Sequence, residues 1–148
     1  MIKTFRGMLA DGAQDTIVLH TNNGSTGYRI VKFDIMMNNF GSNRGSFIQV
    51  WKVEQDSVST GEPTIDFSDQ TLLGTAMQVY NATNLVLSGQ TTFFDQEVFN
   101  QDIYITHTER SGGGGCNYYL ELEQVNLDLN ENTVATLKDI RNVKTQGF

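Results

Sequence analysis

The residues of this chain that could do chemistry are few, and their spacing does not fit catalysis. The 148-residue sequence has two histidines, His20 and His107, and one cysteine, Cys116. The histidines show neither a His-x-His nor a His-Glu-x-x-His pattern, so a zinc site would need both of them and a carboxylate from distant segments. Each is more simply explained as a surface or hydrogen-bonded residue. We therefore expect no catalytic residue, no metal ligand and no cofactor.

The cysteine and the serines do not indicate a nucleophile either. A catalytic cysteine needs a positioned histidine, whereas Cys116 alternates with the apolar side chains of an expected strand that runs to Leu122. This pattern predicts a buried and unreactive thiol. Ser25 lies in Gly24-Ser25-Thr26-Gly27, which is typical of a turn and not of the Gly-x-Ser-x-Gly elbow of hydrolases.

The carboxylates leave two kinds of chemistry open. Glu121 and Glu123 share one strand face, and paired carboxylates can hydrolyse glycosidic bonds. Because Tyr119 lies beside them on that face, a solvated surface is the better explanation. One further group loosely imitates a calcium loop, but it lacks the central glycine and has too few carboxylates: Asn126, Asp128, Asn130 and Glu131. Another group would bind calcium if its loops converge: Asp66, Asp69, Asp95 and Glu97.

The composition limits the partners. Charged residues make up 18% of the chain and the net charge is −7, with a sequence pI of about 4.6. An acidic surface repels nucleic-acid backbones and anionic membranes, so we expect neither as a partner. A small basic patch stays possible within residues 29–52, formed by Arg29, Lys32, Arg44 and Lys52. The first residues lack the apolar segment of a signal peptide, and no apolar run is long enough to span a membrane.

The elements that must position these residues are mainly strands. The chain has 14 glycines and one proline, and its polar residues are mostly Asn, Gln, Thr and Ser, which suit strands and turns. Alternation of apolar and polar side chains predicts strands separated by Gly- and Asn-rich turns. The expected strands are Ile2–Leu9, Thr16–Thr21, Gly27–Met37, Ser46–Val53, Leu72–Tyr80, Asn84–Leu87, Thr91–Phe94, Gln101–Thr108 and Cys116–Leu129.

Three details of these strands are specific predictions. Residues 46–53 have apolar side chains on both faces, so this strand should be central and covered on both sides, for example by a neighbouring subunit, with Trp51 a core packing residue. In the last strand the apolar parity changes, which predicts a β-bulge near Glu123-Gln124. Val134, Leu137 and Ile140 recur at helical spacing, so a short amphipathic helix is expected over about 131–142.

The sequence therefore predicts one domain over residues 1–148, an all-β antiparallel two-layer sandwich with a short C-terminal helix. Six segments, taken in order, resemble small virion-associated proteins of tailed bacteriophages, especially those from aquatic environments. These segments are His20–Gly24, Thr26–Phe33, Asp66–Leu73, Val98–Ile105, Asn117–Glu123 and Thr133–Asn142. The resemblance implies a sandwich of jelly-roll type that acts as a capsid decoration (cement) protein or a related head or tail component, with no catalytic residues.

This resemblance sets the functional expectation: a non-enzymatic virion protein, made in the host cytoplasm, that binds and stabilises the capsid shell. Its partners would be the major capsid protein or other virion proteins, and its own copies in a homo-oligomer, with a trimer favoured. The alternative is a tail- or fibre-associated carbohydrate- or receptor-binding module, which would present exposed aromatic side chains. The candidates for that role are Tyr28, Trp51, Tyr80, Tyr118 and Tyr119. An enzyme such as a glycosidase or a cupin-like oxygenase would need a histidine and carboxylate cluster that the sequence hardly supplies.

Overall fold

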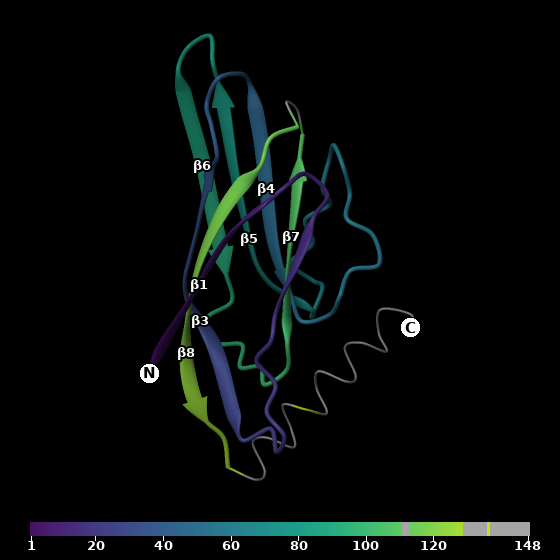
Figure 1. The fold of residues 1–148 in the computed structure, drawn as a ribbon, viewed down its shortest axis with the longest axis vertical. Helices are drawn as coiled ribbons and strands as arrows, with labels where there is room; N and C mark the ends of the chain where they lie inside the picture. Colours follow the sequence, from purple (N-terminus) through teal and green to yellow (C-terminus); the bar gives the residue numbers. More distant parts are fainter. Residues whose placement is uncertain (111–112, 129–135, 137–148) are drawn as a thin grey trace.

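The protein is a sandwich of two antiparallel sheets that face each other, as the alternating sequence predicts (Figure 1). We describe it from a computed structural model, which covers residues 1–110, 113–128 and 136. Eight strands lie in these residues. They are β1 (Ile2–Leu9), β2 (Gln14–Ile17), β3 (Thr26–Met37), β4 (Arg44–Trp51), β5 (Leu72–Asn81), β6 (Val86–Phe93), β7 (Ile103–Glu109) and β8 (Cys116–Asn126).

The strands follow the order of a jelly roll with one exception. The smaller sheet has the order β1-β8-β3 and the larger sheet the order β2-β7-β4-β5-β6. The chain thus crosses between the sheets repeatedly, as it does in a jelly roll. The exception is β6, which forms a hairpin with β5 and extends the larger sheet, where a jelly roll would return it to the smaller one. As a result, β6 is an edge strand with one neighbour.

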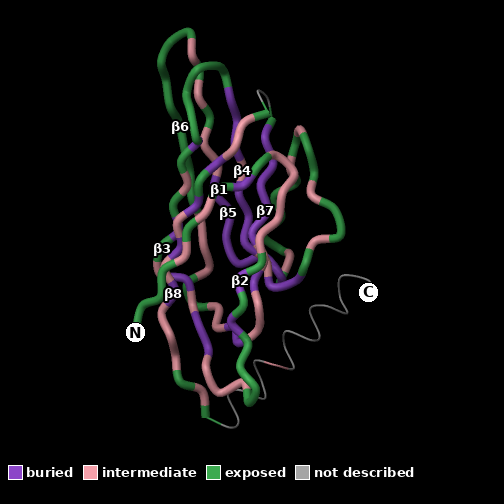
Figure 2. Tube along the Cα trace, in the orientation of Figure 1, coloured by how far each residue is buried: buried purple, intermediate pink, exposed green. Residues whose placement is uncertain are grey.

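The core lies between the two sheets (Figure 2). Along β8, side chains alternate between the inside and the outside, and every second one from Cys116 to Leu122 is buried. The register with β1 places Phe5 opposite Leu120 and Leu9 opposite Cys116, so the apolar faces of neighbouring strands coincide. This agreement of parity across strands is what fixes the sheet register.

The predicted β-bulge exists, but in a different strand. The pairing of β8 with β3 is continuous through residues 123–124, and the register shifts instead in β3, where Val31 is the extra residue. The bulge changes which side chains face the core. Simple alternation would place Val31 on the same face as the buried Phe33, but as the extra residue Val31 is only half-buried. The inward side chains are Tyr28 and Ile30 before the bulge and Phe33 and Met37 after it.

Strand β4 is central, as expected, but the chain itself covers its outer face. Its neighbours are β5 and β7, and Ile48 and Val50 are fully buried on the inner face. On the outer face, the loop after β4 folds back over the sheet. The Gln49 side-chain amide donates a hydrogen bond to the Thr64 carbonyl at 3.4 Å, and the Thr108 hydroxyl donates one to the Ser59 carbonyl at 2.7 Å. A neighbouring subunit is therefore not required as cover.

Trp51 is not a core residue, so that prediction was wrong. The strand parity places Trp51 on the outer face of β4, where it is half-buried, and it lies outside the core cluster. Its indole N–H donates a hydrogen bond to the Thr106 hydroxyl at 3.0 Å. This bond joins two strands of the larger sheet, and on the outer face Trp51 lines a pocket together with loop residues such as Val58 and Pro63, away from the contact between the two sheets.

Several strand boundaries differ from the predictions. Strand β2 begins and ends earlier than residues 16–21. The two short strands expected at residues 84–87 and 91–94 are one strand, β6, which pairs with β5 along its whole length. Strand β8 ends at Asn126, before the expected residue 129. The helix expected over about 131–142 lies outside the described residues except for Thr136, whose hydroxyl accepts a hydrogen bond from the Asn100 amide at 2.9 Å.

Candidate functional site

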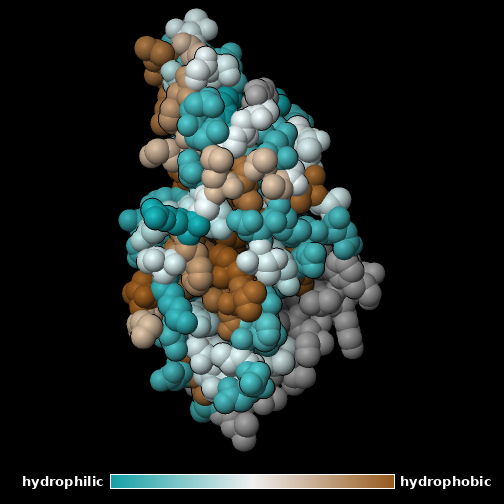
Figure 3. All heavy atoms as spheres, viewed as in Figure 1, coloured by the Kyte–Doolittle hydropathy of each residue, from teal (hydrophilic) through white to brown (hydrophobic). Residues whose placement is uncertain are grey.

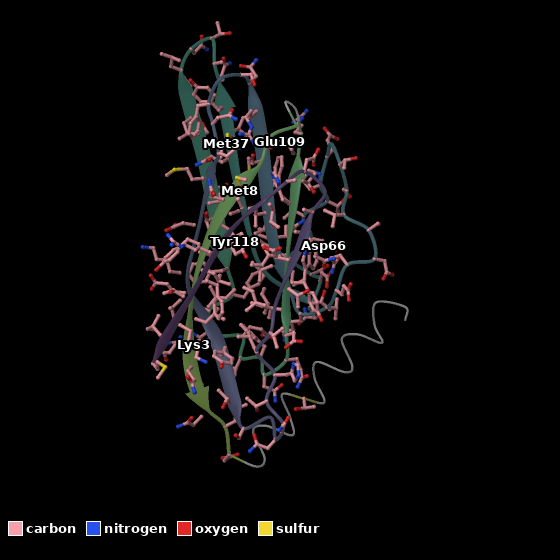
Figure 4. The ribbon with its side chains drawn as sticks, viewed as in Figure 1. Lys3, Met8, Met37, Asp66, Glu109 and Tyr118 are labelled. Atoms are coloured by element: carbon pink, nitrogen blue, oxygen red, sulfur yellow. The ribbon has the colours of Figure 1, made fainter. Side chains whose placement is uncertain are left out.

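Several polar side chains are buried together between the two sheets, at the end of the sandwich where Glu109 lies (Figure 4). The guanidinium of Arg44 donates a hydrogen bond to Glu109 Oε1 at 2.5 Å, and the side chains are 1% and 0% exposed. The Ser46 hydroxyl donates to the second carboxylate oxygen, Glu109 Oε2, also at 2.5 Å. A buried charge is stable only when it is paired and hydrogen-bonded, and both conditions are met here.

The glycine-rich segment before β8 completes the surroundings of this ion pair. Arg44 Nη2 donates to the Gly115 carbonyl at 2.8 Å, and Nη1 donates to Asn38 Oδ1 at 2.8 Å. A Cβ atom at Gly114 would lie 2.7 Å from the guanidinium, so no larger residue fits there without displacing Arg44. At this position glycine therefore lets the backbone approach a buried cation.

Ser46, His107 and Glu109 lie close together, but not in the arrangement of a catalytic triad. The serine hydroxyl is bonded to the carboxylate, whereas nucleophilic catalysis requires it to be bonded to the histidine. His107 Nδ1 lies 2.9 Å from the Leu9 carbonyl oxygen, and its Nε2 lies 3.5 Å from Glu109 Oε2. All three residues are at most 2% exposed, so no substrate reaches them. The cluster joins the sheets and offers no reaction centre.

Cys116 is fully buried, as predicted. Burial raises the pKa of its thiol to about 11, because the thiolate would lose its solvation inside the sandwich. The thiolate is the reactive form of cysteine, so it is scarce at neutral pH.

His20 lies on the surface in the loop after β2, not on a strand. Its Nδ1 is 2.7 Å from Asp102 Oδ1, and the same oxygen accepts hydrogen bonds from the backbone N–H groups of Leu19 and His20. Partial burial tends to raise the pKa of Asp102, but these hydrogen bonds outweigh that effect and lower it. The group fastens the loop to the start of β7.

Of the two groups expected as possible calcium ligands, the first includes Asn130 and Glu131, which lie outside the described residues, and the second does not form a metal-binding group. Asp66 and Asp69 each accept hydrogen bonds from a residue two positions later, Ser68 and Thr71, and so close their own turns. Glu97 instead pairs with Lys52 at 2.7 Å. Within residues 1–110 and 113–128, no three or more His, Cys, Asp or Glu side chains are grouped so that they could hold a metal ion.

The possible basic patch does not form, because each of its residues is paired with a carboxylate. Besides the buried pairs of Arg44 and Lys52, Arg29 lies 3.2 Å from Glu123 and Lys32 lies 3.8 Å from Asp34. The neighbouring Glu121 accepts a hydrogen bond from the Tyr119 hydroxyl at 2.6 Å. This bond raises the pKa of Tyr119. Glu121 and Glu123 are thus part of a half-exposed face, as expected.

The outer face of the smaller sheet carries the largest groove described, with a volume of about 670 Å³. In one row across the sheet, Met8 and Met36 flank Asn117; in the next row, Arg6 and Asp34 flank Tyr119. Met8 and Met36 are 58% and 60% exposed. Figure 4 shows Met8 beside Tyr118, which comes from the neighbouring strand β8 and also lines the groove. We call this surface the methionine groove.

Arg6 differs from the other arginines within the described part of the chain. Arg29, Arg44 and Arg110 each have a carboxylate partner, whereas Arg6 has none. An unpaired guanidinium in a groove with two exposed thioethers and a phenol is a group of side chains that is enriched at protein interfaces.

Sequence reasoning found only part of this groove. Tyr119 was among the five aromatic candidates for a binding surface, but Arg6, Met8 and Met36 were not singled out. The other aromatic candidates lie elsewhere or face inward: Tyr28 is buried and Tyr80 packs edge-to-face against Phe40. Tyr118 is buried with its hydroxyl bonded to Asp15 at 2.9 Å, and burial first and Asp15 second raise its pKa. The alternation of side chains in β1 and β3 indicates which of them face outward. That these side chains form one surface became clear only once both strands were known to flank β8.

The comparisons with known proteins assign no family. No family model and no curated protein matches the chain. Among solved structures, the chain is similar to a legume lectin-like domain from Entamoeba histolytica, with 7% sequence identity over 86% of this chain and 90% of that chain, and a TM-score of 0.26. A TM-score this low supports no statement about shared fold or function. In the described residues, no helix is both long enough and apolar enough to cross a membrane.

Proposed function

We propose that this chain is a non-enzymatic structural protein of a virus particle, a capsid decoration (cement) protein that binds the shell through the methionine groove. The observation that carries the proposal is the unpaired Arg6 beside exposed Met8 and Met36, on a face whose other charges are paired. The segments that resemble phage virion proteins supply the kind of partner, the major capsid protein.

The chemistry of the groove suits a protein partner. Methionine side chains are flexible and polarizable, so they adapt to a partner's surface. Arginine and tyrosine are the residues that, with tryptophan, most often dominate binding energy at interfaces. Arg6 and Tyr119 are cross-strand neighbours, so a partner segment lying along the sheet would contact both.

The mechanism of such a protein is passive. A rigid sandwich, present as a homo-oligomer, would bridge neighbouring shell subunits and oppose the pressure of packaged DNA. Contacts that are weak singly become strong when several copies bind one lattice together. The net charge of −7 suits the outside of the particle, because DNA would repel it inside.

The test is reattachment. Shells that lack the protein should lose DNA at a lower temperature or lower salt concentration, and should recover when the purified chain is added back. Arg6→Glu should weaken rebinding at least about tenfold, because a buried interface charge of the wrong sign costs more than 1.4 kcal/mol.

Arg110→Glu is the matched control. It makes the same change of charge at a side chain that is 64% exposed and distant from the groove, so rebinding should be unchanged. The proposal fails if stripped shells are as robust as complete ones, or if both variants rebind like the wild type.

One observation favours the alternative of a tail- or fibre-associated carbohydrate-binding module. Tyr119 is half-exposed in the groove beside Asp34 and Asn117, and an aromatic ring with nearby amide and carboxylate groups can hold a sugar. A glycan array separates the two functions: binding that is lost in Tyr119→Ala, together with a location at the tail tip, would put the receptor-binding module first.

A further inference from the structure

We infer that the β5–β6 hairpin joins this chain to a second copy of itself, with the free edge of β6 pairing antiparallel to the β6 edge of the partner. This inference does not depend on the virion function proposed above, because it concerns a different surface. It rests on three independent features of the hairpin: its open edge, an exposed leucine in a strained turn, and the absence of charge.

The first feature is the open edge. Among the described residues β6 is the last strand of the larger sheet, so the backbone N–H and C=O groups on its outer side have no strand partner there. Residues 86–91 are all exposed (Figure 2). Proteins usually block such an edge with lysine, proline, a bulge or a very short strand. Strand β6 has eight residues, no charged residue, no proline and an unshifted register with β5.

The second feature is Leu85 in the turn of the hairpin. Its φ is 56°, in the left-handed region, and it is the single non-glycine residue with positive φ among those described. Asparagine or glycine suits that conformation much better than leucine. Leu85 is also 76% exposed, so it gains nothing from burial within its own chain. Leucine at this position is therefore unfavourable in its backbone conformation and in its exposure to solvent. A second molecule that covers the side chain would explain why leucine is found there.

The apolar surface extends beyond Leu85. Val86 and Leu87 are 51% and 50% exposed, and Val79 on the neighbouring strand is 39% exposed. Figure 3 shows these hydrophobic side chains along the hairpin that projects from one end of the molecule. Because successive strand residues point to opposite faces, these apolar side chains lie on both faces of the hairpin, and exposed apolar residues gathered on a projecting element mark an interaction site.

The third feature selects the partner. Residues 70–94, which include the whole hairpin, contain no Asp, Glu, Lys or Arg, although the chain carries a net charge of −7. Two copies approaching by any charged face would repel each other, whereas two hairpins meet without like charges opposed. A second copy also brings the same open edge, which is what an unpaired strand requires.

The resulting contact is self-complementary. Antiparallel pairing of two identical edges creates a two-fold axis near the middle of β6, close to Gly89. The larger sheets of the two copies would then continue into one ten-stranded sheet, and each Leu85 turn would lie beside the base of the partner's β6.

The experiment is sedimentation velocity over a concentration series. The wild-type chain should pass from monomer to dimer. The double variant Ser88→Glu/Gln90→Glu places carboxylates of both copies next to the two-fold axis, so it should associate at least about tenfold more weakly. The control Ser57→Glu/Gln70→Glu adds the same charge at two exposed loop residues and should associate like the wild type.

Hydrogen exchange gives a second measurement. Outward-facing backbone amides of β6 should become protected at concentrations where the dimer forms, and should exchange freely in the double variant. A wild-type chain that stays monomeric throughout the series overturns the inference. So does association that is equal in the double variant and its control, which would place the contact elsewhere.

Discussion

Two neighbouring regions of this sandwich depart from the usual distribution of side chains: one buries charged groups and the other exposes apolar ones. Between the sheets, the ion pair of Arg44 and Glu109 is sealed from solvent. On the β5–β6 hairpin, which pairs with β4 next to that cluster, Leu85, Val86 and Leu87 face solvent. The charges are inside because every donor and acceptor of Arg44 and Glu109 finds a partner there. The apolar side chains outside are not covered by any part of the chain that the structure describes.

The difference teaches where to look for function. In the buried polar cluster the charges of Arg44 and Glu109 are paired and hydrogen-bonded, and His107 Nε2 is the atom without a hydrogen-bond partner among them, so the cluster supports the fold and is closed to any ligand by its burial. An exposed apolar segment with an open strand edge is incomplete, so it needs another molecule. In this protein the residues that suggest chemistry in the sequence lie in the buried polar cluster. The residues that suggest none lie in the exposed apolar segment.

The largest expected effect comes from breaking the buried ion pair. Glu109→Ala leaves the Arg44 guanidinium buried without its carboxylate, which should lower the free energy of unfolding by about 3–5 kcal/mol. Urea unfolding measures this. Glu62→Ala, which removes the carboxylate of an exposed pair with Arg110, should change stability by less than about 1 kcal/mol. Equal effects of the two changes would refute the contrast between the buried and exposed regions.

The next largest expected effect is a loss of folding stability at alkaline pH. Because the pKa of Cys116 is raised from 9.0 to about 11 in the folded chain, the folded state keeps a proton that the unfolded state loses, and stability falls as pH rises from about 9 to about 11. The loss should be about 2–3 kcal/mol from this group. Cys116→Ala should show a shallower decline over the same range, and identical slopes would count against a buried thiol. At neutral pH the wild-type thiol should react slowly with a labelling reagent.

The stability change expected for a Trp51 variant is intermediate between those of core and surface variants. Because it is half-buried under the loop, Trp51→Ala should cost about 1–2 kcal/mol, whereas the core change Leu120→Ala should cost about 2–5 kcal/mol. Thermal or urea unfolding of the two variants gives the order. A larger loss for Trp51→Ala would mean that the loop contact, and not the layer between the sheets, dominates stability.

The smallest effect has the opposite sign. Leu85→Asn relieves the positive φ and removes an exposed apolar side chain, so it should stabilise the fold by about 0.5–1 kcal/mol. The same change should weaken self-association, because it removes part of the contact proposed for the hairpin. A variant that is both less stable and equally associated would show that Leu85 has a role within its own chain.

The sequence was enough to predict the class of fold, because alternation along segments such as residues 27–37 and 116–122 reports which face is buried. It was not enough to place the bulge. The parity change at Val125 was visible, but the pairing of β8 with both neighbours keeps β8 regular and moves the extra residue to Val31 in β3. A local pattern does not say which of two paired strands absorbs an irregularity.

The candidate surfaces were harder to predict than the fold. The inert nature of Cys116 followed from its alternation, but Arg44 and Glu109 are far apart in sequence, and only the pairing of β4 with β7 brings them together. Met8 and Met36 are likewise far apart in sequence, and they share one row of the sheet only because β1 and β3 both pair with β8. The absence of charged residues over 70–94 can be seen in the sequence alone. It indicates a contact surface only when the structure shows that β6 is an edge strand.

The position of β8 has a consequence for how the protein is made. It is the central strand of the smaller sheet, yet it is the last strand to be synthesised of those described. Until it emerges from the ribosome, β1 and β3 have no strand between them, so neither can pair in the sheet. We therefore expect folding to wait until β8 has been synthesised and then to be slow, because loop closure between β1 and β8 has a high entropic cost. During that interval the nascent chain would depend on chaperones to keep its apolar strands apart.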